Sequence, residues 1–163
     1  MIDATALYDR FRSGELSGTR LRRELHETWR VDHWVLPILG ADRVREMFRA
    51  GRSRVPAVPH ILYRGVREDE FYFGWSFTDD VATAELYATV RGGFGEVISA
   101  SIPPEHVLDI IIHHGYREYV VDGDALEYAL HPFEIISEHH GGILSNGKKN
   151  PHRLGASLFG AFG

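Results

Sequence analysis

Cysteine is absent from this 163-residue chain, which excludes a disulfide framework and any metal site built on thiolates. Long apolar runs are absent too, and none approaches the ~18–20 residues that a membrane-spanning helix requires. The first residues, MIDATALYDRFRSG, carry charges where a signal peptide would have its apolar region. These absences predict a soluble, unprocessed, cytoplasmic protein that does not engage a membrane.

The composition is that of one folded domain. Hydrophobic residues make up 44% of the chain and aromatic residues 12%, enough to build a core. Charge is uneven, because residues 1–67 hold 13 lysines and arginines against 8 acidic residues, whereas residues 68–163 hold 5 against 15. The acidic second part argues against a nucleic-acid groove there. The basic first part is typical of a solvated helical surface, which we favour over a docking site for an acidic partner.

Residues 1–55 are predicted to form a helical part. Apolar residues recur there with helical spacing, and Gly51 is a plausible helix end. Asp42 is a plausible N-cap of the second of these helices. The apolar stripes are Leu21, Leu25 and Trp29, then Val44, Met47 and Phe48.

A β-rich core is predicted over residues 60–137, after a connector of glycine and proline at 51–59. One helix interrupts it, capped by Thr78 or Asp79. This order, helices first and many short strands afterwards, predicts an α+β fold. The expected strands are 61–66, 71–78, 96–102, 107–112, 118–121 and 131–137, with the helix at 81–90 and an irregular tail at 141–163.

Three short segments contain residues suited to chemistry. Arg64 precedes a glycine at a strand end, where its paired donors can clamp a phosphate. Ser76 and Thr78 alternate with Phe77, so a strand would place both hydroxyls on one face. Glu118 stands among apolar β-formers, where a carboxylate costs desolvation unless it has a partner. Each signal is weak by itself, since an arginine beside a turn and hydroxyls in a strand are usually structural.

In this order and spacing, the segments Tyr63-Arg64-Gly65, Ser76-Phe77-Thr78 with its following helix, and Glu118 resemble the Arg-Ser-Glu class of mono-ADP-ribosyltransferases, which includes bacterial toxins and phage-encoded enzymes. The resemblance covers roughly residues 60–125. It implies a split β-sandwich, with two facing and mostly antiparallel sheets, flanked here by the N-terminal helices. It also implies that NAD is the co-substrate and that no metal takes part.

The resemblance assigns a role to each residue of the predicted site. Arg64 would hold the NAD pyrophosphate, and Glu118 would be the catalytic carboxylate that stabilises positive charge developing on the ribose. Ser76 would orient Glu118 or the ribose, with Thr78 supporting the strand. Gly65 would let the backbone approach the nicotinamide amide. Tyr87 and Phe94 are candidates to sandwich the nicotinamide ring.

The implied activity is transfer of ADP-ribose to a macromolecular target, most simply a protein of a bacterial host, as by a phage or bacterial effector. A nucleic acid is an open alternative as acceptor. The sequence departs from the family pattern at Phe77, where threonine is usual, and at Tyr116. Arginine-modifying members carry Glu or Gln at the position of Tyr116, two before the catalytic glutamate, so arginine is not the expected acceptor.

Two other functions share these residues. Water could replace the macromolecular acceptor, which would make the protein an NAD glycohydrolase. Alternatively, a binding or inhibitor protein could keep the fold without turnover. The histidine pairs 113–114 and 139–140 are interpreted as solvated loop residues. Neither pair is expected to bind a metal, because two adjacent residues of a strand would point to opposite faces and would rarely bind the same ion. The glycines at 92–95 lack the spacing of a nucleotide-binding loop.

Overall fold

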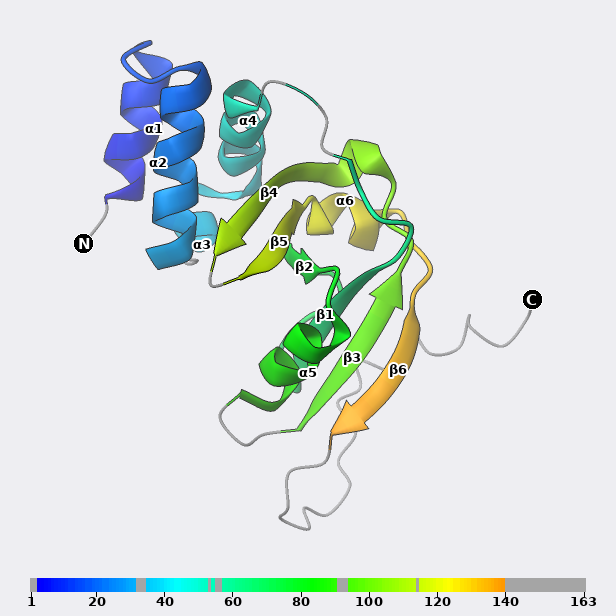
Figure 1. Ribbon diagram of the computed structural model, residues 1–163. Coiled ribbons are helices and arrows are strands. Elements are labelled where there is room, and N and C mark those ends of the chain that lie inside the picture. The colour runs from blue at the N-terminus through cyan, green and yellow to red at the C-terminus, as the bar shows by residue number, and fades with distance from the viewer. Residues whose placement is uncertain are drawn as a thin grey trace.

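The computed structural model describes residues 3–31, 35–52, 54, 57–90, 94–113 and 115–139. Four helices come first in the chain and are followed by the strands of a sheet, with two further α-helices in the connections between strands (Figure 1). This order confirms the α+β class. The predicted tail at 141–163 lies outside the described residues. The elements are α1 Ala4–Arg12, α2 Gly18–Val31, α3 Val35–Leu39, α4 Ala41–Gly51, β1 Leu62–Arg67, β2 Ser76–Thr78, α5 Val81–Thr89, β3 Gly95–Ala100, the 3₁₀ turn η2 Pro104–His106, β4 Val107–His113, β5 Tyr116–Val121, α6 Gly123–Tyr128 and β6 Glu134–His139.

The helical part follows the apolar periodicity of the sequence. Leu21, Leu25 and Trp29 are all buried along α2, and α4 ends at Gly51 as predicted. The N-cap of α4 is Gly40 rather than Asp42, which lies in the first turn of the helix. Its carboxylate there forms an ion pair with an arginine three residues later instead of capping the backbone.

The six strands form one open antiparallel sheet in the order β4-β5-β2-β1-β3-β6. Two facing sheets were expected, and the described strands do not show them. The join between β1 and β2 is narrow, because Tyr63 and Thr78 are their one register pair. β2 is also shorter than the predicted run 71–78 and begins at Ser76. The residues just before it, Phe73 and Trp75, are buried without being in a strand.

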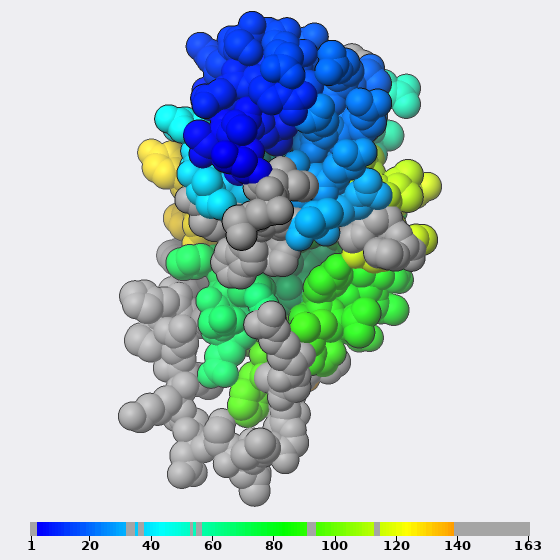
Figure 2. Space-filling view, turned by 90° about the vertical axis from the view of Figure 1, so that its left-hand side faces the viewer, coloured from blue at the N-terminus to red at the C-terminus, as the bar shows by residue number. Residues whose placement is uncertain are grey.

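The helical part and α5 lie on the same face of the sheet. Val120 of β5 packs into the core of the helical part, whereas Val97 of β3 packs against Ala84 and Ala88 of α5. In Figure 2 the blue and cyan atoms of the helical part form one end of the molecule, and the green atoms of α5 lie toward the other. The opposite face of the sheet carries a second core that includes Leu126 of α6. Helix α6 was not predicted from the sequence.

Two buried aspartates fasten the helical part to the sheet. Asp109 of β4 accepts hydrogen bonds from Arg22 (2.8 and 2.9 Å) and contacts His26 at 2.8 Å, both on α2. Asp122, at the end of β5, accepts from Arg45 of α4 at 2.6 and 2.9 Å. The helices therefore hold a fixed position over β4 and β5. Among the described residues, no helix has the length and apolar character needed to cross a membrane.

Candidate functional site

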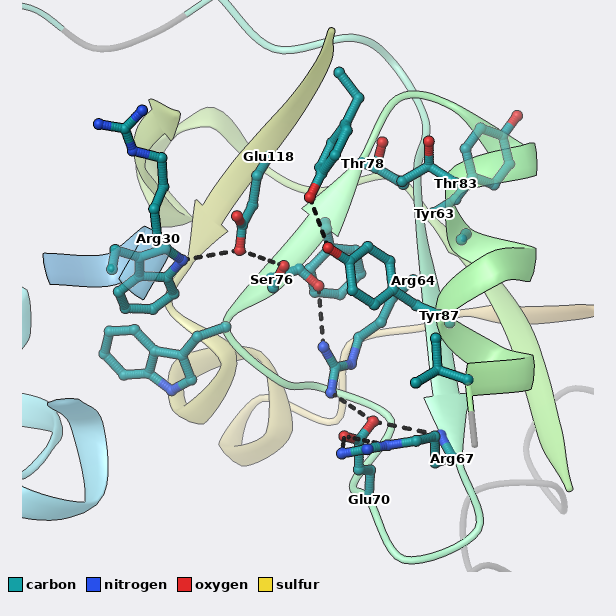
Figure 3. Close-up of a pocket in the computed structure, with 17 residues that line it drawn as sticks. Arg30, Tyr63, Arg64, Arg67, Glu70, Ser76, Thr78, Thr83, Tyr87 and Glu118 are labelled. Atoms are coloured by element: carbon teal, nitrogen blue, oxygen red, sulfur yellow. Dashed lines mark hydrogen bonds and ion pairs between the residues drawn. The ribbon is translucent and has the colours of Figure 1, made fainter. Parts of the chain in front are cut away.

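A cleft of about 440 Å³ lies on the sheet face between the helical part and α5 (Figure 3). Its volume falls in the usual range for small-molecule sites, roughly 300–1,000 Å³. Seven of the eight site residues predicted from the sequence line this one cleft, although they come from four different elements. These are Arg64 and Gly65 of β1, Ser76 and Thr78 of β2, Tyr87 of α5, and Tyr116 and Glu118 of β5.

Ser76 links the other two residues of the predicted triad. Its hydroxyl donates to Glu118 Oε1 at 2.6 Å, and its backbone carbonyl accepts from Arg64 Nη1 at 3.0 Å. The register explains the first contact, because Ser76 is paired with Val120 and Thr78 with Glu118, which puts all four side chains on one face. Arg64, Ser76 and Glu118 therefore form one connected polar network (Figure 3).

Glu118 also has a partner from outside the sheet. Trp29 Nε1 of α2 donates to the same oxygen, Oε1, at 2.8 Å. The Trp29 ring is buried and packs edge-to-face on Phe48 of α4, with centroids 5.4 Å apart and an interplanar angle of 82°. Because an indole N–H can only donate, Glu118 Oε1 is the acceptor of this bond. The two donors fix the glutamate side chain at the cleft wall.

Arg64 reaches the cleft from the opposite side of β1. Leu62 and Val66, two positions to either side of it, lie in the core on the face of the sheet away from the cleft. Because side chains two positions apart in a strand share a face, the Arg64 side chain starts from that face as well. The strands diverge after the Tyr63–Thr78 pair, and the guanidinium occupies that opening beside Gly74. A Cβ at Gly74 would lie 2.4 Å from Arg64 Cζ, so a larger residue at position 74 would displace the guanidinium from this opening.

The burial of Arg64 has electrostatic consequences. Its side chain is 13% exposed, and desolvation lowers the pKa of the guanidinium, partly offset by the charge of Glu70. Within the described part of the chain, its buried Nε has no hydrogen-bond partner. A buried donor without a partner is costly, so the group is poised to gain from an anionic or carbonyl-bearing ligand.

Gly65 and Thr78 have structural roles at the floor of the cleft. A Cβ on Gly65 would lie 2.1 Å from the carbonyl oxygen of Ala84, so glycine lets α5 pack directly on β1. Thr78 Oγ1 accepts from the backbone N–H of Asp80 at 3.1 Å. Asp80, and not Thr78 or Asp79, is the N-cap of α5, accepting from the Thr83 N–H at 3.0 Å. Their proposed contacts with a ligand stay predictions.

Two tyrosines stand at the rim of the cleft. The hydroxyls of Tyr87 and Tyr116 are 2.6 Å apart, and their rings meet edge-to-face at 6.4 Å. Burial, followed by the contact with Tyr87, raises the pKa of Tyr116 above its ordinary value. The hydroxyl is therefore neutral at physiological pH. Phe94, the other aromatic candidate, does not belong to the cleft lining, because it lies beyond the far end of α5 at the start of β3.

Sequence reasoning missed three charged residues and two tryptophans in the lining, Trp29 and Trp75. The charged residues are Arg30, Arg67 and Glu70. A signal existed for Trp29, since a buried indole N–H requires an acceptor, but its place in an apolar stripe indicated only core. Glu70 stands three residues after Arg67, a spacing that suits an ion pair in a turn, although nothing in the sequence linked that pair to Arg64.

The described side chains contain no group of three or more histidine, aspartate or glutamate residues that could hold a metal ion. The side chains of the paired histidines at 113–114 and 139–140 lie outside the described ones, but His113 and His139 are the last residues of β4 and β6, so these two do not lie in loops as predicted. Comparisons of the chain with protein-family models, with curated proteins and with solved structures found no match.

Proposed function

We propose that this protein is a mono-ADP-ribosyltransferase that cleaves NAD at the nicotinamide–ribose bond and transfers ADP-ribose to a macromolecule, most simply a protein. The observation that carries the proposal is the connection of Arg64 to Glu118 through Ser76 within one cleft. The sequence resemblance required these residues to lie together, although 54 positions separate the first from the last. In the open sheet, β1 and β2 are joined by a single residue pair. Under this proposal, the sheet is a form of that family's split sandwich, divided between these two strands.

The donor set fits NAD at both ends of the cleft. Arg64 supplies positive charge at one end, suited to a pyrophosphate, whereas Glu118 supplies negative charge at the other (Figure 3). NAD would bring a glycosidic bond whose cleavage develops positive charge on the ribose while nicotinamide leaves with the bonding electrons.

The residues of the cleft would stabilise that positive charge because they hold the carboxylate and the ligand in fixed positions. Trp29 and Ser76 hold the Glu118 carboxylate in place, so it need not reorganise as positive charge develops beside it. Arg64 holds the pyrophosphate end, which keeps the ribose in line with the carboxylate. The acceptor group attacks the ribose carbon and loses its proton, so that the products are the modified acceptor, nicotinamide and one proton.

The test is release of nicotinamide from NAD by the pure protein, with and without a bacterial lysate, together with label transfer from tagged NAD. Glu118→Gln should lower nicotinamide release by at least about 100-fold while NAD affinity changes little. Glu96→Gln is a matched control, because Glu96 also lies in a strand of this sheet but does not line the cleft. Like Glu118, it accepts a hydrogen bond from a hydroxyl, that of Tyr72, at 2.8 Å.

Each alternative gives a different result. Nicotinamide release without label on any macromolecule indicates an NAD glycohydrolase. Binding of NAD without release indicates a non-catalytic binding protein. Full activity in Glu118→Gln would remove the catalytic assignment altogether.

A further inference from the structure

Glu70 occupies the position of an anion between two arginines of the cleft. Its Oε2 lies 3.3 Å from Arg64 Nη2 and 3.3 Å from the backbone nitrogen of Arg67. Its Oε1 accepts from Arg67 Nε at 3.0 Å and also contacts Arg67 Nη2. Two guanidinium groups and one backbone N–H thus converge on a single carboxylate, a donor arrangement that also suits phosphate oxygens.

The three side chains are accessible from the cleft to different degrees. Exposed fractions are 13% for Arg64, 33% for Arg67 and 26% for Glu70, and all three line the cleft. In Figure 3 they lie together at the end of the cleft away from Glu118. Two guanidinium groups and one carboxylate thus meet at this end of the cleft.

The turn that carries Glu70 allows its side chain to leave. Glu68 and Asp69 before it and Phe71 after it are exposed, and the turn is closed by a backbone bond from the Glu70 N–H to the Arg67 carbonyl at 3.0 Å. That bond does not involve the carboxylate. A change of side-chain rotamer can therefore move Glu70 into solvent without unfolding the turn.

We propose that Arg64 and Arg67 form a binding site for a diphosphate and that Glu70 is an internal anion which the diphosphate displaces. This inference rests on the proposed function for the identity of the ligand, NAD, and adds Arg67 as a second phosphate-binding residue. A diphosphate and Glu70 cannot share the site, because like charges within about 4 Å repel strongly in a partly buried environment. In the empty protein, Glu70 keeps the two arginines arranged and prevents their mutual repulsion.

Isothermal titration calorimetry with inorganic pyrophosphate and with ADP-ribose tests the proposal. Glu70→Gln should bind both ligands about tenfold more tightly than the wild type, because the amide has nearly the same shape but no charge to displace. Asp69→Asn is the matched control: it removes one negative charge from the same turn, at an exposed position outside the cleft lining, and should change affinity less than twofold. Arg67→Gln should weaken binding of both ligands at least tenfold.

The opposite results would overturn the proposal. Unchanged or weaker binding by Glu70→Gln would mean that Glu70 serves only to hold the arginines in place. Equal tightening by Asp69→Asn would mean that net charge alone is responsible, and failure of the wild type and Glu70→Gln to bind either ligand would exclude the site. If the binding results hold but no nicotinamide is released from NAD, the proposed function fails while the diphosphate site stands. Tightening for ADP-ribose but not pyrophosphate would assign the effect to the nucleoside parts and contradict the proposal.

Discussion

The indole nitrogen of Trp29 lies 2.8 Å from Glu118 Oε1, so a helix outside the region of family resemblance holds the proposed catalytic carboxylate. The contact joins α2 to β5 across 89 positions of the chain. It depends on the docking of the whole helical part, which Asp109 and Asp122 fasten to the sheet. The N-terminal helices are thus part of the site rather than an appendage.

Trp29→Phe should lower kcat about tenfold and leave KM for NAD within about twofold. The phenyl ring keeps the packing on Phe48, but the hydrogen bond to a charged group, worth roughly 1.5–3 kcal/mol, is lost. Steady-state kinetics of nicotinamide release measure both constants. Tyr8→Phe is the control, since it removes a hydroxyl bond to the Glu46 carboxylate at 2.9 Å within the helical part, away from the cleft. An unchanged kcat in Trp29→Phe would mean that Ser76 suffices to place Glu118.

Asp109 should make the stability of the fold depend on acid pH. Burial acts to raise its pKa, but hydrogen bonds from His26 and Arg22 outweigh burial and hold the pKa at about 2. The folded-state pKa is therefore lower than the unfolded value near 3.8, and the charged form stabilises the fold. This contribution, about 2 kcal/mol, is fully present above pH ~5 and is lost as the pH falls toward 2.

Urea unfolding at several pH values, with Asp109→Asn beside the wild type, measures this contribution. The variant should be less stable by about 3 kcal/mol at pH 7, because Arg22 and His26 lose their buried partner. The gap should narrow as the pH drops below 4. Asp9→Asn, at an exposed position of α1, should follow the wild type throughout. A gap that is constant with pH would show that the pKa of Asp109 is the same in the folded and unfolded protein.

Gly65→Ala should destabilise the protein by roughly 3 kcal/mol or more, because the new methyl group would lie 2.1 Å from the backbone carbonyl of Ala84 and force α5 off the sheet. Thermal unfolding should show a fall of several degrees in Tm. Gly14→Ala is the comparison, since nothing lies within 4 Å of its Cβ position and the cost is only that of a φ of +81°, about 1 kcal/mol. If the two variants lose equal stability, the close approach of α5 is not what requires glycine at position 65.

The sequence predicted local structure well where apolar periodicity or a breaker decided it. Helix α4 ends at Gly51, and α5 and the strands around β3 and β4 lie where expected. Helix α6 and the short length of β2 were missed, because they depend on tertiary packing. The capping carboxylate of Asp122 is at the same time committed to Arg45, a partner 77 positions away.

The sequence predicted which residues form the candidate site, but it did not predict all of the contacts that these residues make. Order and spacing pointed to Arg64, Ser76 and Glu118, and the fold brings them together. Neither order nor spacing could show that Trp29 would donate to Glu118, or that Glu70 would stand between two arginines. Such contacts depend on where the strands diverge and how the helices dock, and a single sequence does not encode those distances locally.

Tyr116 offers a test of which acceptor the cleft serves. Its pKa is raised, first by burial and then by Tyr87, so it presents a neutral hydroxyl. Arginine-modifying members of the family that the sequence resembles carry Glu or Gln at this position. Tyr116→Phe should therefore leave nicotinamide release to water within about threefold, because Ser76 and Trp29 still hold Glu118. Transfer of label to the target in a lysate should fall at least about tenfold, since the rim loses the hydroxyl pair.

Tyr87→Phe removes the other hydroxyl of the same 2.6 Å contact and is the matched variant. Equal losses of transfer in both variants indicate that the pair acts as a unit at the rim, whereas a loss in Tyr116→Phe alone places the acceptor against Tyr116. Tyr116→Glu should gain transfer to a small guanidine, which the wild type should not modify, because the new carboxylate can pair with that cation. Modification of the guanidine by the wild-type protein would show that a neutral tyrosine suffices for arginine, and the acceptor would then have to be sought among arginine side chains.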